Sequence, residues 1–250
     1  MAPENSNVLF VNEIAYRRLG VDSDVYPHNL PVMRGFDSFR FDSPVTFIVG
    51  ENGSGKSTLI EAFAMALGFN AEGGTRNFSF STYNSTSDLY RHLTVKRSFK
   101  RPQDGFFLRA ESFYNVATTI ENIDGEGGLG GSIINSYGGR SLHAQSHGES
   151  YIALMENRFG GNGIYLLDEP ESALSPQRQY AMLFLIHELV KKNSQFIIAT
   201  HSPVILAYPG AAIYSIDGEN IKRVAYEECE QYQFTRDFLK NYKQYISFLD

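Results

Sequence analysis

Eight consecutive residues combine glycines with a lysine and a hydroxyl at the spacing of a phosphate-binding loop: Gly50-Glu51-Asn52-Gly53-Ser54-Gly55-Lys56-Ser57. Glycines let successive backbone N–H groups turn toward phosphate oxygens, and the start of the following helix adds partial positive charge. We expect Lys56 to contact the β- and γ-phosphates of a nucleotide and Ser57 to ligate Mg²⁺, with Thr58 beside them. The pattern therefore predicts a nucleotide site at this turn.

A second apolar run, Ile164 to Leu167, ends in two adjacent carboxylates, Asp168 and Glu169. In a protein with a phosphate loop, we expect Asp168 to hold Mg²⁺ and Glu169 to orient and deprotonate the attacking water. A separate carboxylate is needed as the base because the first is occupied by the metal. Without the phosphate loop, such a strand end would be an ordinary transition from sheet to loop.

Two further groups stand where they could reach a phosphate. Ser146-His147-Gly148-Glu149 begins a helical pattern, in which Ser146 can donate its hydroxyl and Gly148 leaves room for close approach. His201 directly follows an apolar strand that ends at Ala199 and Thr200. The alternatives are that Ser146 is only a helix cap and that His201 is a structural histidine.

Taken in order, the phosphate loop, Ser146–Glu149, Asp168-Glu169-Pro170 and His201 resemble the motifs of the ATP-binding-cassette (ABC) superfamily of ATPases over most of the chain. The resemblance implies Mg²⁺-dependent ATP hydrolysis in a homodimer that closes head to tail around two ATP molecules. It assigns the signature segment, including Gly148 and Glu149, to the γ-phosphate bound by the other copy. It also implies that His201 reaches the γ-phosphate and the attacking water.

The sequence departs from the ABC pattern at several places. His147 and Glu149 replace the usual glycine and glutamine of the signature, and Ser175 replaces the aspartate that usually ends the loop after Glu169. A glutamine that joins the metal site to the helical lobe has no clear counterpart. Glu111, after a predicted strand at Phe106 to Leu108, is the best candidate and could contact Mg²⁺ through water.

For the adenine base, an aromatic or cationic side chain of the amino-terminal sheet should stack on the ring. Three residues are candidates, and the sequence does not choose among them: Phe36, Phe39 and Arg40.

Strands that alternate with helices predict an α/β fold: a phosphate-loop NTPase core of three layers with a mainly parallel sheet. Residues 7–48 read as short antiparallel strands at its edge, and a small helical lobe is expected at about 111–160. We expect helices over 56–67, 151–159, 176–191 and 234–245, and a hairpin over 211–225. The whole chain, 1–250, is expected to form one domain.

Composition excludes some classes of protein. Hydrophobic residues make up 42% of the chain and aromatics 14%, as in globular proteins, and no apolar run approaches bilayer length. A single cysteine, Cys229, and the lack of a secretory signal favour a cytoplasmic protein without membrane insertion. The net charge of −6 argues against broad attraction to nucleic acid, although Tyr90 to Arg101 forms one basic cluster.

Within the ABC superfamily, two segments resemble those of small ATPases related to SMC and RecF-like proteins: Asp168-Glu169-Pro170-Glu171 and Thr200-His201-Ser202-Pro203. We therefore expect a stand-alone mechanochemical ATPase. The alternatives are the ATP-hydrolysing subunit of a membrane transporter, and an ATP-gated module that binds DNA or a protein with slow turnover. The partner is not fixed by the fold.

Overall fold

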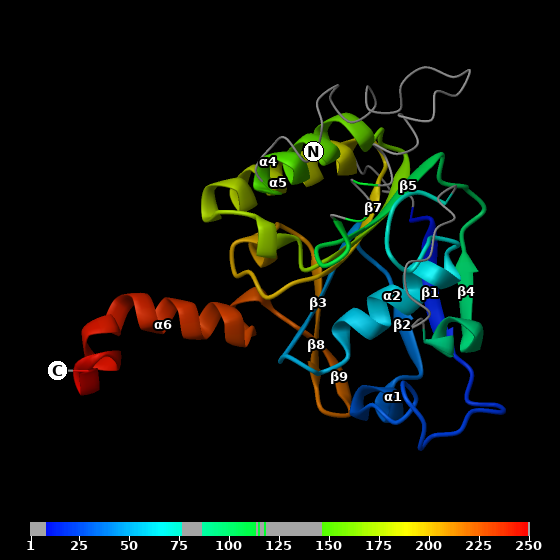
Figure 1. The fold of residues 1–250 in the computed structure, drawn as a ribbon, viewed down its shortest axis with the longest axis horizontal. Helices are drawn as coiled ribbons and strands as arrows, with labels where there is room; N and C mark the ends of the chain where they lie inside the picture. Colours follow the sequence, from blue (N-terminus) through cyan, green and yellow to red (C-terminus); the bar gives the residue numbers. More distant parts are fainter. Residues whose placement is uncertain (1–8, 77–86, 114, 116–117, 119–146, 250) are drawn as a thin grey trace, which may run out of the picture.

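The central sheet has six strands in the order β5-β6-β7-β3-β8-β9. The computed structural model describes residues 9–76, 87–113, 115, 118 and 147–249 (Figure 1). The strands are β3 (Val45–Gly50), β5 (Asp104–Arg109), β6 (Gly163–Asp168), β7 (Gln195–Ala199), β8 (Ala212–Asp217) and β9 (Asn220–Val224). All neighbouring pairs are parallel except β8 and β9, which form the predicted hairpin.

Both faces of this sheet are covered, which explains why its inner strands are largely apolar. Phe47 of β3 packs into a core with α4 (His147–Arg158) and α5 (Pro176–Lys191), whereas the next residue, Ile48, packs into a second core with α2 (Lys56–Ala66). The alternation follows from the two-residue period of a strand. The predicted three-layer arrangement is confirmed.

A separate antiparallel sheet of three strands has the order β2-β1-β4 and packs on the α2 side of the molecule. It consists of β1 (Val11–Tyr16), β2 (Ser38–Arg40) and β4 (Leu93–Arg97). Gln195 links the two sheets, because its side chain accepts hydrogen bonds from the backbone of Phe10 and Val11 and donates one to Val11. The predicted antiparallel edge sheet is therefore present, with a third strand from later in the chain.

Short elements connect these layers. The helix α1 (Pro31–Gly35) lies between β1 and β2, and 3-10 turns lie in several other connections and after the last helix. They are η1 (Asp88–His92), η4 (Pro170–Ala173), η5 (Ile205–Ala207), η6 (Tyr226–Glu228) and η7 (Ser247–Leu249). Of the helical lobe expected at 111–160, most of 111–146, with the glycine-rich runs, lies outside the described residues.

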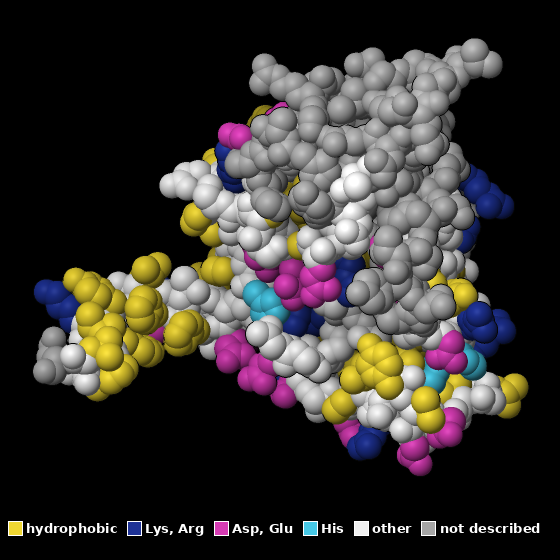
Figure 2. All heavy atoms as spheres, viewed as in Figure 1, with side chains coloured by type: hydrophobic (Ala, Val, Ile, Leu, Met, Phe, Trp, Pro, Cys, Tyr) yellow, Lys and Arg dark blue, Asp and Glu magenta, His cyan; other side chains and the backbone are white. Residues whose placement is uncertain are grey.

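The last helix, α6 (Glu230–Tyr245), extends away from the body of the molecule (Figure 1). The predicted helix is confirmed, but it buries no residue, and Figure 2 shows hydrophobic side chains gathered along it. The exposed ones include Phe234, Leu239 and Tyr242. Tyr232, near the start of α6, packs on the core beside Tyr226, whereas most of the apolar face of the helix is exposed.

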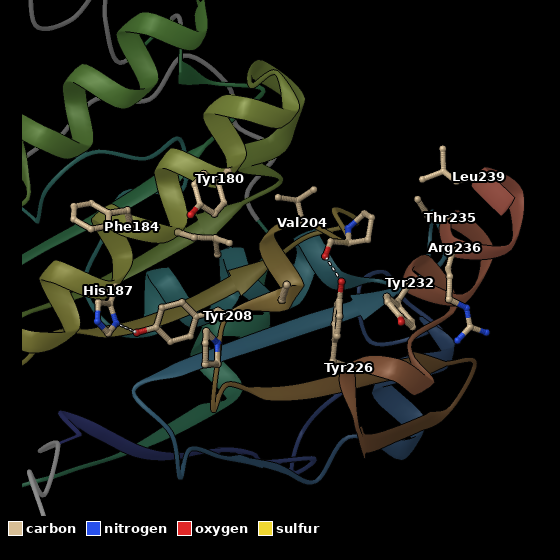
Figure 3. Close-up of a pocket in the computed structure, with 14 residues that line it drawn as sticks. Tyr180, Phe184, His187, Val204, Tyr208, Tyr226, Tyr232, Thr235, Arg236 and Leu239 are labelled. Carbon is tan, nitrogen blue, oxygen red and sulfur yellow. Dashed lines mark hydrogen bonds between the residues drawn. The ribbon is translucent and has the colours of Figure 1, made fainter. Parts of the chain in front are cut away.

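A groove of about 680 Å³ separates the beginning of α6 from α5. Figure 3 shows Tyr180 and Phe184 of α5 on one side, with Tyr226, Tyr232 and Leu239 on the other. Tyr226 donates a hydrogen bond to the carbonyl oxygen of Pro203 at 2.8 Å, which holds the chain in place just before α6 begins. Within the described residues, no helix is both long and apolar enough to span a bilayer.

Candidate active site

The strand register brings the predicted site residues to one edge of the sheet. Arg109, the last residue of β5, stands opposite Asp168, the last residue of β6, and Asp168 stands opposite Ala199 of β7. Ala199 in turn pairs with Ile48 of β3, just before the phosphate loop. In parallel sheets the carboxyl ends of the strands share one edge, so segments that are far apart in sequence converge there.

The phosphate loop joins β3 to α2 through backbone that favours glycine. Gly53 has φ of +80° and Gly55 has φ of +93°, and a Cβ on Gly55 would lie 2.8 Å from Val32. Lys56 is buried, and its ammonium donates to the carbonyl oxygens of Gly50 at 2.9 Å and Glu51 at 2.8 Å. Burial lowers the pKa of Lys56, against the opposing charges of Glu169, Asp168 and Glu171. The lysine is therefore anchored over its own loop.

The partly buried Ser57 and the buried Asp168 present neighbouring oxygen atoms, and the Ser57 hydroxyl donates to Oδ1 of Asp168 at 3.1 Å. Burial raises the pKa of Asp168 to about 7, even though Arg109 and the Ser57 hydroxyl favour its charged form. Burial therefore disfavours the charged form of this carboxyl group, and a bound cation would favour it. Its donor set is therefore of the kind that a hard divalent cation prefers.

Arg109 is a site residue that sequence reasoning missed. Its Nε lies 3.6 Å from Oδ2 of Asp168, and its Nη1 lies 2.6 Å from Oε2 of Glu61. Glu111, predicted as a metal contact, is 82% exposed, and its carboxylate lies 3.4 Å from Nη2 of Arg109. The only signal in the sequence was position: Arg109 ends the strand beside the one that carries Asp168.

Glu169 begins the turn after β6 in a backbone conformation that is rare for a residue with a side chain, with φ of +49°. Its carboxylate is 42% exposed, and its Oε1 lies 3.9 Å from Nε2 of His201. That nitrogen is buried and has no hydrogen-bond partner among the described residues. Burial and the charge of Lys56 lower the pKa of His201, so the ring is neutral at neutral pH.

Glu171 fixes the loop that carries His201. One carboxylate oxygen accepts from the Thr200 hydroxyl at 2.7 Å and the other accepts from the backbone N–H of His201. The next residue, Ser202, donates its hydroxyl to Gln179 of α5 at 2.6 Å. The turn after β6 and the turn after β7 are thus tied together by side chains as well as by the sheet.

The predicted signature segment is described only in part, since Ser146 lies outside the described residues. Gly148, in the first turn of α4, packs against η4: a Cβ there would lie 2.7 Å from the carbonyl oxygen of Ala173 and 2.5 Å from Nη1 of Arg178. Glu149 forms an ion pair with Arg178 at 3.0 Å. The glycine therefore allows α4 to approach the turn that follows Glu169.

Two of the three residues predicted as candidates for adenine stacking are wrong. Phe36 and Phe39 are fully buried in the core around α2, so neither can stack on a base from solvent, and of the three only Arg40 is exposed. Tyr26, which sequence reasoning missed, is 59% exposed, and its hydroxyl lies 3.3 Å from the Thr58 hydroxyl in α2. It therefore offers an aromatic ring beside the phosphate loop.

Two cavities open at this edge of the sheet. One of about 190 Å³ is lined by Ser57, Arg109, Ala110, Glu111, Asp168, Glu169 and Ser172. Another of about 460 Å³ is lined by Gly50, Glu51, Asn52, His201, Glu230, Gln231 and Phe234. Figure 2 shows acidic side chains beside a histidine near the base of the projecting helix. The phosphate loop, the two carboxylates and the histidine thus share one face.

Known protein families match both halves of the chain. A family described as AAA domain matches residues 28–157, which is more than half of the chain, and one described as AAA ATPase domain matches residues 148–206. Both matches include site residues: the first contains the phosphate loop, and the second contains Asp168, Glu169 and His201.

Individual relatives come from two groups. An energy-coupling factor transporter ATP-binding protein of Fusobacterium nucleatum is 30% identical over 164 residues, which cover 62% of this chain and 62% of that protein. Structural maintenance of chromosomes protein 6 of Takifugu rubripes is 30% identical over 105 residues, covering 42% of this chain and 8% of that protein. The chain thus spans less than two thirds of the length of either relative.

Among solved structures, cbiO1 of Clostridium perfringens, described as part of an ABC transporter complex, superposes with a TM-score of 0.53. The match covers 92% of this chain and 96% of that one at 15% sequence identity. At this level of identity the likeness concerns the fold alone.

Proposed function

The chain belongs to the ABC superfamily of ATPases, with SMC proteins among its relatives, and on that premise we propose that it is a Mg²⁺-dependent ATP hydrolase whose two copies close around two ATP molecules. The observation that carries this proposal is the convergence of the phosphate loop, Asp168, Glu169 and His201 at one edge of the sheet. The proposal includes a cytoplasmic location, which agrees with a single, buried cysteine.

Ser57 and Asp168 are the residues that would hold Mg²⁺, because they present a hydroxyl and a buried carboxylate 3.1 Å apart. Glu111 lines the same cavity and would contact the ion through water. When bound, Mg²⁺ supplies charge neutralisation for the β- and γ-phosphate oxygens. Lys56 would move from the loop carbonyls to those phosphates, which accept hydrogen bonds from its ammonium more strongly.

Glu169 is the base in this proposal. Its partly exposed carboxylate takes a proton from water as the water oxygen bonds to the γ-phosphorus and the bond to the bridging oxygen of ADP breaks. His201, whose neutral form is favoured by its lowered pKa, donates one hydrogen bond from Nε2 to the γ-phosphate or to the attacking water, since this nitrogen has no hydrogen-bond partner among the described residues. Glu171 positions that ring through the Thr200–His201 backbone.

Tyr26 is the residue that we propose for the adenine ring, in place of Phe36 and Phe39. Its exposed ring and its contact with Thr58 put an aromatic face next to the nucleotide phosphates. Replacing Tyr26 with alanine should raise the KM for ATP, whereas phenylalanine should preserve it. An unchanged KM in Tyr26→Ala would exclude this role.

The second copy would supply Ser146 and the start of α4, including Gly148, to the γ-phosphate. Within one copy α4 packs on the turn after Glu169. A phosphate bound at the amino end of α4 would therefore affect the position of Glu169, the proposed general base. We expect Glu169→Gln to bind ATP without hydrolysing it and to elute as a dimer in size-exclusion chromatography with ATP and Mg²⁺. The double variant Lys56→Ala, Glu169→Gln is the control that should stay monomeric.

The outcome that would overturn the dimer is a Glu169→Gln protein that binds ATP at saturation and still elutes as a monomer. An ATP-dependent dimer in the double variant would also count against it, because the lysine would then have no part in closing the sandwich.

A second candidate, the energising subunit of a membrane transporter, is favoured by the similarity to the energy-coupling factor transporter ATP-binding protein. Hydrolysis by the purified chain alone favours the stand-alone enzyme. Stable co-purification with one integral membrane protein, together with a strong increase in ATPase rate in its presence, would favour the transporter.

A further inference from the structure

Two histidines and one aspartate converge at a second place, outside the nucleotide site. His28 belongs to the segment between β1 and α1, while Asp88 and His92 belong to η1. One ligand atom from each of the three residues lies within 4.8 Å of the other two. We propose that His28, Asp88 and His92 bind a transition-metal ion of the Zn²⁺ class, and this site does not depend on the proposed function.

The spacing of the first pair fits a shared ion. Nε2 of His28 and Oδ1 of Asp88 lie 3.1 Å apart, and two ligands of one tetrahedral Zn²⁺ lie roughly 3.3 Å apart, as its bond lengths require. The His28 and His92 rings are almost perpendicular, at 87°, with centroids 5.1 Å apart. One ring nitrogen of each histidine lies within 4.8 Å of the other and of the Asp88 carboxylate.

The other nitrogen of His28 has the partner that a ligating histidine needs. Nδ1 of His28 lies 2.8 Å from the Tyr16 hydroxyl, within hydrogen-bond distance. With a metal on Nε2, Nδ1–H would donate to the phenol oxygen and fix the tautomer. The buried His28 is therefore oriented from β1 before any ion arrives.

His92, the third ligand, and the exposed side of the cluster at Asp88 also suit a metal site. No side-chain hydrogen bond to the His92 ring occurs among the described residues, so ligation there would break none that the structure records. Asp88 is 54% exposed, which leaves water access for the remaining coordination positions. Two imidazoles with one carboxylate suit Zn²⁺, Co²⁺ or Ni²⁺, whereas Mg²⁺ prefers oxygen ligands throughout.

Bound metal would join two segments that flank the nucleotide side of the molecule. His28 lies two residues after Tyr26, and His92 leads directly into β4, which pairs with β1 (Figure 1). The ion would thus tie the segment between β1 and α1 to the edge sheet. We expect it to raise the melting temperature of the full chain, as any ligand of the folded state does.

The test titrates metal-stripped full-length protein with Zn²⁺, in competition with a chromophoric chelator, without nucleotide and with excess Mg²⁺ to occupy oxygen sites. Wild type should bind about one Zn²⁺ per chain, and Co²⁺ should give the absorption bands of a low-coordinate site. His92→Ala and Asp88→Asn should bind at least about tenfold more weakly, and Tyr16→Phe several-fold more weakly.

His187→Ala is the matched control, because His187 lies on α5 beside Tyr208 and takes no part in the cluster. It should bind Zn²⁺ as wild type does and keep the rise in melting temperature. The proposal is overturned if wild type binds no Zn²⁺ under these conditions, or if His92→Ala and Asp88→Asn match wild type in affinity, stoichiometry and Co²⁺ spectrum. His92 is partly exposed, so its replacement should leave the fold intact.

Discussion

Burial in the folded protein favours the neutral form of the Asp168 carboxyl group, whereas metal binding needs its charged form. The carboxyl group is 5% exposed, and its burial raises its pKa to about 7, whereas a carboxyl group in an unfolded chain titrates near pH 4. The folded protein therefore binds this proton more tightly than the unfolded chain does. It follows that this group's contribution to stability is greatest below about pH 4 and is lost as the pH rises toward 7.

We therefore expect Asp168→Asn to stabilise the protein in the absence of nucleotide and Mg²⁺. At pH 8 its melting temperature should exceed that of wild type by a few degrees, on the order of 1 kcal/mol, and the difference should shrink below about pH 5. Thermal unfolding at the two pH values measures this. An Asp168→Asn variant with a melting temperature below that of wild type at pH 8 would show that burial of the charged carboxylate does not destabilise the folded protein.

Asp104→Asn is the matched control, for which we expect the opposite change in stability. Burial alone would raise the pKa of Asp104, but hydrogen bonds from Gly160, Tyr165 and Arg158 hold it below its usual value. Its stabilising contribution is present above the unfolded-state pKa and is lost as the pH falls through the folded-state pKa. Asp104→Asn should therefore destabilise the protein at pH 8.

At the scale of elements, the turns after β6 and β7 act as one unit because Glu171 bridges them. Glu171→Ala would free the backbone at His201, and we expect kcat for ATP to fall by about 10- to 100-fold with little change in KM. Glu171→Gln keeps one carbonyl acceptor for the His201 N–H and should lose less. Steady-state kinetics of both variants, with melting temperatures as a check on folding, measures this.

Equal losses in the alanine and glutamine variants, or a loss of kcat that merely follows a loss of melting temperature, would contradict a positioning role for Glu171. The dependence of kcat on pH is a further measurement, which a purely structural role of Glu171 would leave unchanged. The profile should shift in Glu171→Ala, because the charge that favours protonation of His201 is removed.

The helix α6 behaves differently from the other helices because it buries no side chain. A chain that ends after Cys229 should therefore unfold cooperatively, with a melting temperature within a few degrees of the full-length value. Cys229 itself is buried and should stay in the shortened chain. Circular dichroism on heating measures this, and loss of a cooperative transition would mean that α6 supports the core.

At the scale of the whole molecule, the sequence predicted the layers and the main site, because those depend on local patterns. The phosphate loop, the apolar strand before Asp168 and the helix from Pro176 to Lys191 each carry their signal within a few residues, and the structure confirms these elements. The predicted chemical roles of the site residues, and of Ser146 in particular, stay predictions.

What the sequence did not predict depends on contacts between distant segments. Phe36 and Phe39 belong to the predicted edge sheet and are therefore candidates for adenine stacking, but α2 and Tyr214 cover them. Arg109 reaches Asp168 only through strand register, and Tyr26 reaches Thr58 only through the path of a long connection. Such pairings follow from topology, which periodicity in a single sequence does not specify.

We propose that each ATP is held by Lys56 of one copy and by the start of α4 of another, so that catalysis needs two chains. The most direct measurement is the ATPase rate per molecule as a function of protein concentration, at saturating ATP and Mg²⁺. We predict a rate that rises steeply at low concentration and levels off as the dimer forms. A rate per molecule that is constant down to concentrations at which the protein is monomeric in the presence of ATP would contradict shared sites.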